Sequence, residues 1–376
     1  MGPGTLIRCT DIIMASECAF DYVYLGKSGL KVSNMCLGTA IFGDPSDRGC
    51  SKDTSIKILE KFSSLGGNFI DTADVYNMHG RGDSERIIGE WLATKQRDDF
   101  VIGTKLFFPM DQKNVNSRGL SRKHIVKSIE ESLDRLGTSY VDLYTMHCWD
   151  YGTPIEETLR TFNDLARQGK VLHIGASNFT GWQLQKVVDY CKYMGLEPVI
   201  CTQMHYSLLT RQVEYEISDL CRQEEIALMP WSPLKGGWLS GKMQRNSDAA
   251  PSGSRIAWSQ EDPARKQALS QPDWDTFASQ ESTWTLLDTI EAIAKEEGKT
   301  MAQVSLRWLL QKPSVASIVI GAKNEEQLTA NVGASKGWCL SADQMNRLDD
   351  ASALPEMYPY AMVNRLNQGR FRTEYK

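Results

Sequence analysis

Three short apolar segments of this sequence carry side chains that can take part in acid–base chemistry at or near their ends. Segment 68–74 contains Asp71, segment 100–105 ends on Lys105, and segment 141–147 ends on His147. Tyr76 follows the first of these segments. A phenol with a pKa near 10 donates its proton poorly at neutral pH, but a neighbouring ammonium group favours its phenolate. We therefore predict that Lys105 lowers the pKa of Tyr76 and makes it a proton donor.

Asp71 and His147 have chemistry that complements this pair. A buried ammonium group needs a counter-ion, and Asp71 could supply one to Lys105. His147 could donate a hydrogen bond to a substrate oxygen and orient it. Taken singly, each of these residues is more often a cap, a solvated charge or a structural histidine. Together they are suited to protonating an oxygen while hydride arrives at the carbon bonded to it.

The elements that must position these residues follow a regular alternation of short apolar segments and longer amphipathic ones. Strands are expected at residues 34–39, 68–74, 100–105, 141–147, 171–177, 199–205, 226–231 and 317–322. Most are nearly continuous apolar runs, as in parallel strands that are covered on both faces. Eight strands, each followed by a helix, predict the α/β class and a single-domain TIM (β/α)8 barrel. Such a barrel carries its chemistry at the carboxyl ends of its strands.

Capping residues mark the expected helix ends. Ser121 is an expected N-cap and Gly137 an expected stop of the same helix, while Asp83 and Ser84 are expected to cap a helix over residues 85–92.

Two regions interrupt the alternation of strands and helices. Residues 236–281 show little periodicity, and a segment of this length is usually functional or disordered. A further helix is expected over 341–350. We expect residues 1–20 to be an N-terminal extension, 21–352 to be the barrel and 353–376 to be an irregular C-terminal tail.

Composition narrows the classes of partner. The chain has 376 residues, of which 41% are hydrophobic and 24% are charged, with a net charge of −5, as in ordinary globular proteins. No long basic run or membrane-length apolar run appears, so we expect neither a nucleic acid nor a membrane as partner. The nine cysteines contain no Cys-x-x-Cys pair, which favours reduced thiols in the cytoplasm. His and Cys do not cluster at metal-binding spacing, so no metal is expected.

Two strings carry a resemblance to a known family. Segments 69–76 (FIDTADVY) and 175–178 (GASN) together resemble the aldo-keto reductase superfamily, and the similarity extends over residues 24–348. Residues 25–33 resemble the N-terminal β-hairpin of the bacterial-type and potassium-channel β-subunit-like branch. The resemblance implies NADPH-dependent reduction of aldehydes or ketones to alcohols. It implies a catalytic tetrad of Asp71, Tyr76, Lys105 and His147, with Tyr76 as proton donor.

The same resemblance implies that NADPH lies extended across the barrel mouth. The first strand lacks the glycine-rich fingerprint of open dinucleotide-binding folds, which is consistent with this mode of binding. The resemblance implies that Trp231 stacks on the nicotinamide and that Ser177, Asn178 and Gln203 bind its carboxamide. It implies that the backbone amides of Leu234 and Gly236, with Lys242, bind the diphosphate. Gln327 and Asn331 match adenine-side positions, and Arg255 and Lys323 favour a 2′-phosphate and thus NADPH over NADH. The implied cofactor-binding residues are Thr39, Ser177, Asn178, Gln203, Trp231, Ser232, Leu234, Gly236, Lys242, Arg255, Gly321, Lys323, Gln327 and Asn331.

Aromatic residues just beyond the strand ends predict an apolar substrate pocket, formed by Phe42, Phe107, Phe108 and Trp149. Such a pocket suits aryl aldehydes, α-dicarbonyls or hydrophobic ketones, and the sequence does not rank them.

A regulatory cofactor-binding subunit with little turnover, like the channel β-subunits, is the main alternative. In that branch, Asn usually stands at the position of His147 and Glu at that of Ala330. The histidine restores a donor to the substrate oxygen, so we favour a working enzyme; a homo-oligomer stays open. Cell adhesion through the tripeptide at 81–83 (RGD) is set aside, because three-residue matches often arise by chance.

Overall fold

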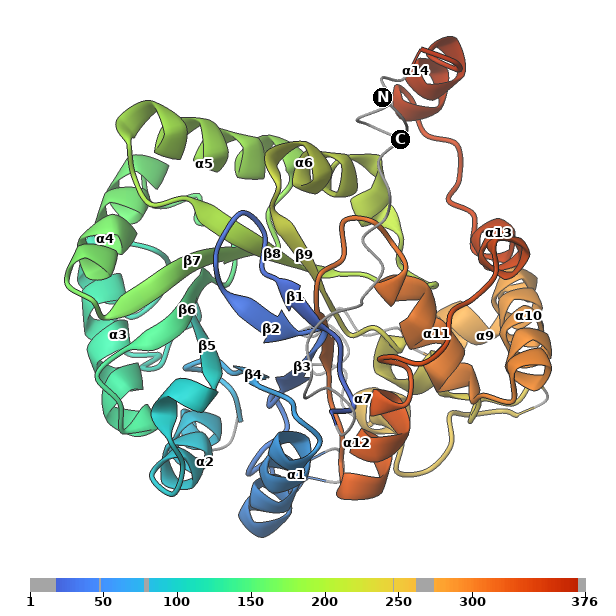
Figure 1. Cartoon of the computed structure of the whole chain (residues 1–376), viewed down its shortest axis with the longest axis horizontal. Helices are drawn as coiled ribbons and strands as arrows, with labels where there is room; N and C mark the ends of the chain where they lie inside the picture. The colour runs from blue at the N-terminus through green and yellow to red at the C-terminus, as the bar shows by residue number, and fades with distance from the viewer. Residues whose placement is uncertain (1–17, 47–48, 78–80, 246, 262–273, 371–376) are drawn as a thin grey trace.

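Eight parallel strands form a closed barrel at the centre of the molecule (Figure 1). The structure is a computed structural model that describes residues 18–46, 49–77, 81–245, 247–261 and 274–370. The strands follow one another around the barrel in chain order, and β10 closes it by pairing with both β3 and β9. Their bounds are β3 Met35–Gly38, β4 Phe69–Asp71, β5 Val101–Leu106, β6 Val141–Met146, β7 Val171–Ser177, β8 Val199–His205, β9 Ala227–Trp231 and β10 Ile318–Ile320. The predicted TIM barrel and all eight predicted strand positions are confirmed.

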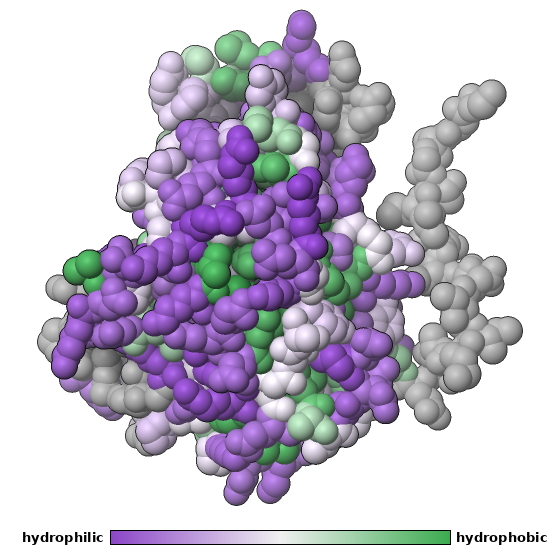
Figure 2. Space-filling model, turned by 90° about the vertical axis from the view of Figure 1, so that its left-hand side faces the viewer, coloured by the Kyte–Doolittle hydropathy of each residue, from purple (hydrophilic) through white to green (hydrophobic). Residues whose placement is uncertain are grey.

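Helices surround the barrel. Their bounds are α1 Lys52–Ser64, α2 Asp83–Leu92, α3 Arg122–Leu136, α4 Ile155–Arg167, α5 Gly181–Met194, α6 Ile217–Glu224, α10 Glu281–Glu297, α11 Met301–Leu310, α12 Glu325–Val332 and α13 Ala342–Ala351. Figure 2 shows the side of the molecule that bears α3 and α4, where hydrophilic residues predominate and hydrophobic ones are scattered. This is the polar outer face expected of amphipathic helices that cover a barrel.

The helix ends agree with the expected capping residues in α3 and differ in α2. The Ser121 side chain accepts from the backbone N–H of His124, and Gly137 ends the helix in the left-handed conformation. The prediction for α2 was wrong by two residues, because the helix already begins at Asp83. Its N-cap is Gly82, which has a φ of 85° and caps through its backbone conformation rather than through a side chain.

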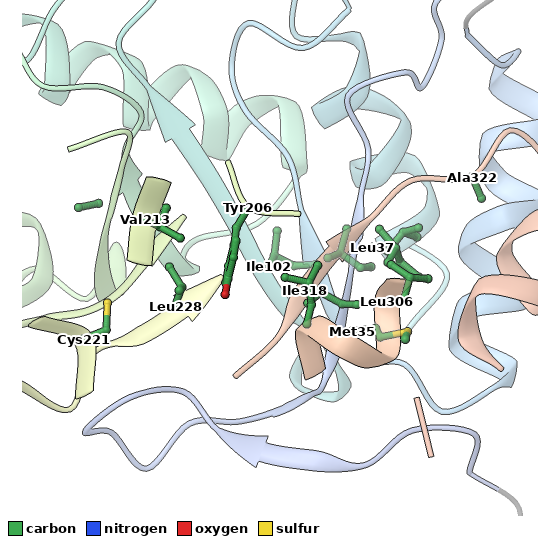
Figure 3. Packing of buried hydrophobic residues seen from close by; sticks show 14 of the residues in the cluster. Met35, Leu37, Ile102, Tyr206, Val213, Cys221, Leu228, Leu306, Ile318 and Ala322 are labelled. Carbon is green, nitrogen blue, oxygen red and sulfur yellow. The ribbon is translucent and has the colours of Figure 1, made fainter. Parts of the chain in front are cut away.

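The core has two parts. The larger one lies between the barrel and its helices and includes Met35, Ile102 and Ile318 (Figure 3). The smaller one joins strand residues such as Phe69 and Leu143 to Leu25 and Val32 of the N-terminal segment. In this segment β1 (Tyr22–Tyr24) and β2 (Lys31–Ser33) pair as the expected antiparallel hairpin. Figure 1 shows the hairpin across the barrel, so its apolar side chains plug one end.

Two regions differ from their expected irregularity. Within 236–281 the structure has η3 (Lys235–Ser240), α7 (Arg255–Gln260) and α9 (Trp274–Ala278). Their tryptophans pack together, with the rings of Trp238 and Trp274 stacked at 5.2 Å, so a local aromatic core replaces helical periodicity. The C-terminal tail contains a short helix, α14 (Tyr360–Leu366), set apart from the barrel (Figure 1). The expected N-terminal extension lies outside the described residues except for its last three, 18–20.

Several further features concern only the described part of the chain. Eight cysteines there carry free thiols. Those residues contain no group of His, Cys, Asp or Glu side chains arranged to hold a metal ion. No helix among them is long and apolar enough to cross a membrane.

Candidate active site

The alternation of side chains along each strand builds the site in layers. Phe69, Val101 and Leu143 belong to the apolar plug inside the barrel. In a strand, side chains two residues apart point to the same face. Asp71 therefore stands one step beyond Phe69, towards the carboxyl ends of the strands, and Lys105 stands two steps beyond Val101. His147, two steps beyond Leu143, comes directly after β6. The sequence pattern thus places polar side chains at the carboxyl ends of the strands, next to an apolar layer inside the barrel.

Lys105 is the centre of the polar layer. It is 1% exposed, and its Nζ donates to Asp71 Oδ2 at 2.6 Å, to the Thr72 carbonyl at 2.7 Å and to the Tyr76 hydroxyl at 3.0 Å. Gln203 Nε2 donates to the other oxygen of Asp71 at 2.7 Å. All three ammonium hydrogens and both carboxylate oxygens therefore have partners. Burial alone would lower the pKa of Lys105, but Asp71 and Tyr76 raise it above its ordinary value, so this lysine stays charged.

The phenol of Tyr76 does not follow the predicted direction. Burial raises its pKa above the usual value of 10, and the opposing effect of Lys105 is smaller. Lys105 does lower the pKa of Tyr76 as predicted, but the expected net lowering is wrong, because desolvation of the phenolate outweighs the nearby charge. The consequence suits an acid, since Tyr76 keeps its proton throughout the neutral range while Lys105 stands ready to stabilise the phenolate.

His147 lies beside Tyr76. Its ring lies 6.0 Å from that of Tyr76, and Phe108 lies 5.1 Å away on an edge-to-face contact. Burial, assisted by the charge on Lys105, lowers the pKa of His147 well below 6.5. Its Nδ1 is buried and has no hydrogen-bond partner among the described residues. A neutral imidazole keeps one N–H donor and one acceptor, so His147 can bind an oxygen without carrying charge.

The ends of β7, β8 and β9 form a second polar cluster beside the tetrad. Ser177 Oγ donates to the Gln203 carbonyl at 3.0 Å. Asn178, in the left-handed region at φ 58°, donates through Nδ2 to the His147 carbonyl at 2.9 Å and accepts from Trp231 Nε1 at 3.2 Å. The structure thus brings together the four residues predicted to hold a nicotinamide and its carboxamide, directly beside Lys105 and His147.

The loop after β9 presents backbone groups in an unusual conformation. Ser232, Lys235, Gly236 and Gly237 all have positive φ angles. Successive backbone N–H groups in such conformations can form concave sites for anions. The side chain of Lys242, further along, is exposed. The segment predicted to clasp a diphosphate therefore has a backbone suited to that task.

Residues predicted for the adenosine end lie around the start of α12. Lys323 Nζ donates to the Gly253 carbonyl at 3.0 Å, which links this lysine to the turn just before Arg255. Gln327 accepts from the backbone N–H of Lys323 at 3.0 Å, and the Asn331 side chain donates to the Gly321 carbonyl at 3.4 Å. The two cations predicted to favour a 2′-phosphate thus belong to one connected region.

Three further predicted cofactor contacts differ in their surroundings. Thr39 is buried; its hydroxyl donates to the Asp71 carbonyl at 3.0 Å and lies 2.7 Å from that of Ser84. Ser232 and Leu234 are partly exposed in the loop after β9. Thr39 therefore supports the strand that carries Asp71.

The four aromatic residues predicted to line the substrate pocket differ in their exposure to solvent. Phe42 is fully buried in the main core. Phe107 and Phe108 contact each other edge to face at 5.4 Å, and Phe108 is 40% exposed beside His147. Trp149 is partly exposed and contacts Phe179 and Trp182. An aromatic rim therefore extends away from the tetrad on the side of β5, β6 and β7.

Sequence reasoning missed two residues of this site. His205 stacks on Trp231 with ring centroids 4.3 Å apart, and Lys235 contacts His205. The spacing could have identified His205, because it stands two residues after Gln203 on the same strand and so points to the same side. No such spacing predicts the orientation of the Lys235 side chain, because this residue lies in an irregular loop.

Comparison with known proteins points to one family. The aldo/keto reductase family matches residues 34–353. Norsolorinic acid reductase stcV of Emericella nidulans is 31% identical over 357 residues, which cover 92% of this chain and 85% of that protein. An aryl-alcohol dehydrogenase [NADP(+)] of Phanerodontia chrysosporium is 30% identical, with 89% and 86% covered. A putative voltage-gated potassium channel subunit beta of Schizosaccharomyces pombe is 34% identical, with 83% and 87% covered.

Proposed function

This chain belongs to the aldo-keto reductase family and is an oxidoreductase, and on that premise we propose that it reduces aldehydes or ketones to alcohols with NADPH. The observation that carries the proposal is the hydrogen-bonded chain from Asp71 through Lys105 to the Tyr76 hydroxyl, beside a neutral His147. These side chains can themselves supply the proton and the positive charge needed to protonate an oxygen in a buried site. A carbonyl oxygen that gains charge as hydride reaches its carbon is the group that requires such a donor.

In the proposed reaction, each member of the tetrad has a separate task. The neutral imidazole of His147 binds the carbonyl oxygen and orients it. Tyr76 gives its proton to that oxygen, and Lys105 stabilises the resulting phenolate. Asp71 holds Lys105 charged and in place, while Gln203 keeps the second oxygen of Asp71 engaged. The pre-aligned charges avoid the reorganisation that water would require, which is a principal source of catalysis by electrostatics.

The residues around Trp231 fit a nicotinamide dinucleotide. Trp231 is a partly exposed aromatic ring, while Ser177 and the amides of Asn178 and Gln203 supply the donors and acceptors that a carboxamide needs. The left-handed loop after β9 suits the diphosphate. When bound, the dinucleotide supplies the hydride. We propose NADPH over NADH because Arg255 and Lys323 come from one connected region, and a 2′-phosphate there would bind two cations.

For the substrate we propose an aromatic carbonyl compound. Phe107, Phe108 and Trp149 form partly exposed aromatic surface next to the tetrad, and aromatic rings bind such surface through edge-to-face and offset contacts. Two relatives bear the names norsolorinic acid reductase and aryl-alcohol dehydrogenase, which is in keeping with such a substrate. The free thiols of the described chain favour a reducing compartment, so we propose a cytoplasmic enzyme.

NADPH oxidation at 340 nm tests the proposal. Purified protein is assayed against aryl aldehydes, α-dicarbonyls and ketones, with Tyr76→Phe alongside. The phenylalanine variant keeps the ring but lacks the proton, so turnover is expected to fall at least 100-fold, the usual order for loss of a general acid, while NADPH affinity is retained. Equal turnover in the variant would remove Tyr76 from the mechanism. Tight NADPH binding without turnover on any substrate class would instead favour a regulatory cofactor-binding subunit.

A further inference from the structure

The loop after β9 carries a buried lysine that the proposed mechanism does not use. Lys235 is 6% exposed, its Nζ donates to His205 Nε2 at 3.3 Å, and it lies 5.5 Å from the centre of the Phe277 ring. Within the described residues it forms no ion pair with a carboxylate. Burying a cation without a counter-ion is unfavourable. The position therefore has a physical cost that the protein by itself leaves uncompensated.

The surroundings of Lys235 are basic rather than acidic. Burial lowers the pKa of His205 to about 3, and the charges on Lys235 and Arg255 contribute to this shift. Burial also lowers the pKa of Lys235 to about 8. His205 is therefore neutral at physiological pH and accepts a hydrogen bond from the lysine. Basic groups from β8, the loop and α7 converge here with no acidic residue contributing to either shift.

The backbone adds a second cost. Lys235 has a φ of 49°, in the left-handed region that residues with a side chain adopt less readily than glycine. It stands between Leu234 and Gly236, whose backbone amides are proposed to bind the diphosphate. Its side chain turns towards His205, which stacks on Trp231 at 4.3 Å. The ammonium group thus lies between the diphosphate loop and the proposed nicotinamide site.

We propose that Lys235 and His205 form an additional anion subsite at the barrel mouth, where the lysine ammonium group binds an oxyanion of a bound ligand. His205 holds the ammonium group in position as a neutral acceptor. The inference rests on the proposed function, because the oxyanion nearest in chemistry and place is the diphosphate of the dinucleotide. A carboxylate on the carbonyl substrate has the same chemistry. In either case, the bound anion offsets the cost of the buried charge on Lys235. The same charge that destabilises the free protein thereby increases its affinity for the ligand.

Ligand affinity in Lys235→Met tests this subsite. Methionine keeps much of the aliphatic side chain and removes the charge, and Lys295→Met, at a side chain that is 72% exposed, is the matched control. NADPH and NADH are titrated by tryptophan fluorescence. A charge-assisted hydrogen bond is lost, so Kd should rise about 10- to 100-fold for both cofactors in Lys235→Met and stay unchanged in Lys295→Met. Equal losses identify the shared diphosphate as the source of the anion.

A substrate carboxylate gives a different result. In that case both cofactors bind Lys235→Met normally, but its KM rises for 4-carboxybenzaldehyde and not for benzaldehyde. Wild-type values for both cofactors and both aldehydes would overturn the subsite. If the wild-type protein binds neither NADPH nor NADH, the proposed function fails instead, and the two failures are thereby distinguished.

The pH dependence of binding separates a charged contact from a structural role. Lys235 is protonated below its pKa of about 8 and loses its charge as the pH rises through that value. If the diphosphate is the anion, Kd for NADH should therefore increase above pH 8 in the wild type and lose this increase in Lys235→Met. The ligand-free variant should unfold at the same or a higher urea concentration, since it no longer buries a charge. A pH dependence that persists in Lys235→Met would refute the assignment of this charge.

Discussion

Lys105→Met removes the ammonium group that contacts the Tyr76 hydroxyl and keeps a side chain of similar length. A unit positive charge 3.0 Å from the phenolate oxygen stabilises it by about 5 to 6 kcal/mol at an effective dielectric constant of about 20. Each 1.36 kcal/mol corresponds to about a tenfold change in rate, so the upper limit of the effect is roughly 10⁴-fold. Since charge develops only partly in the transition state, we expect kcat to fall about 10³-fold, within the usual range for general acid catalysis.

The assay is NADPH oxidation under saturating cofactor and substrate at pH 7. Lys95→Met is the control, because Lys95 is ion-paired with Glu60 on the outside of the barrel, and it should keep wild-type kcat. Cofactor affinity in Lys105→Met should change little, since Lys105 contacts Asp71, Thr72 and Tyr76 rather than the proposed cofactor residues. A kcat within tenfold of the wild type, with unchanged cofactor affinity, would refute the electrostatic role of Lys105.

Stability provides an independent measure of the same charge pair. Lys105 and Asp71 are each 1% exposed, and removing one partner of a buried pair typically costs about 3–5 kcal/mol. Lys105→Met should therefore lower the free energy of unfolding by about this amount in urea. Lys105→Met combined with Asp71→Asn removes both charges and keeps an acceptor for Gln203, so it should recover most of the loss while remaining inactive. Recovery of stability without activity shows that unfolding does not cause the lost turnover.

Three further predictions concern pH, cofactor choice and a helix cap. The pKa of Tyr76 is raised above 10 and that of His147 lies well below 6.5. At saturating NADPH, kcat/KM for the carbonyl should therefore be constant from about pH 6.5 to 10 and fall at higher pH as the phenol ionises. A pH profile of kcat/KM with its midpoint near pH 7 would contradict these shifts. Lys323→Ala with Arg255→Ala should weaken NADPH more than NADH in fluorescence titrations, whereas equal weakening would show that neither reads the 2′-phosphate. Ser121→Ala should cost about 1 kcal/mol in urea unfolding through loss of the α3 N-cap, and no loss would show that the cap adds nothing.

The barrel could be predicted because parallel strands covered on both faces leave nearly continuous apolar segments. The carboxyl ends of the same segments identified Asp71, Lys105 and His147, since the ends of parallel barrel strands meet at one rim. The loop after β9 could not be predicted in this way. Its conformation depends on tertiary contacts such as the stacking of Trp238 on Trp274, and these leave no periodic signal. The direction of Lys235 was missed for this reason.

The error on Tyr76 has a different cause. The sequence indicated which charge stands beside the phenol, but the net shift of its pKa also depends on how completely the group is removed from water. That quantity is a property of the folded cavity, to which distant segments contribute. The same applies to Phe42, which follows a strand end in the sequence but is fully buried in the main core of the structure.

The charge on Lys105 and the neutrality of His147 depend on each other. Two cations in one buried cavity would repel, and here Asp71 keeps the proton on Lys105 while the lysine helps to keep His147 neutral. Removal of Asp71 would thus do more than release one lysine, because it would shift the whole balance of charge in the cavity. The proposed proton transfer from Tyr76 therefore depends on an aspartate that does not itself contact the phenol in the described hydrogen bonds.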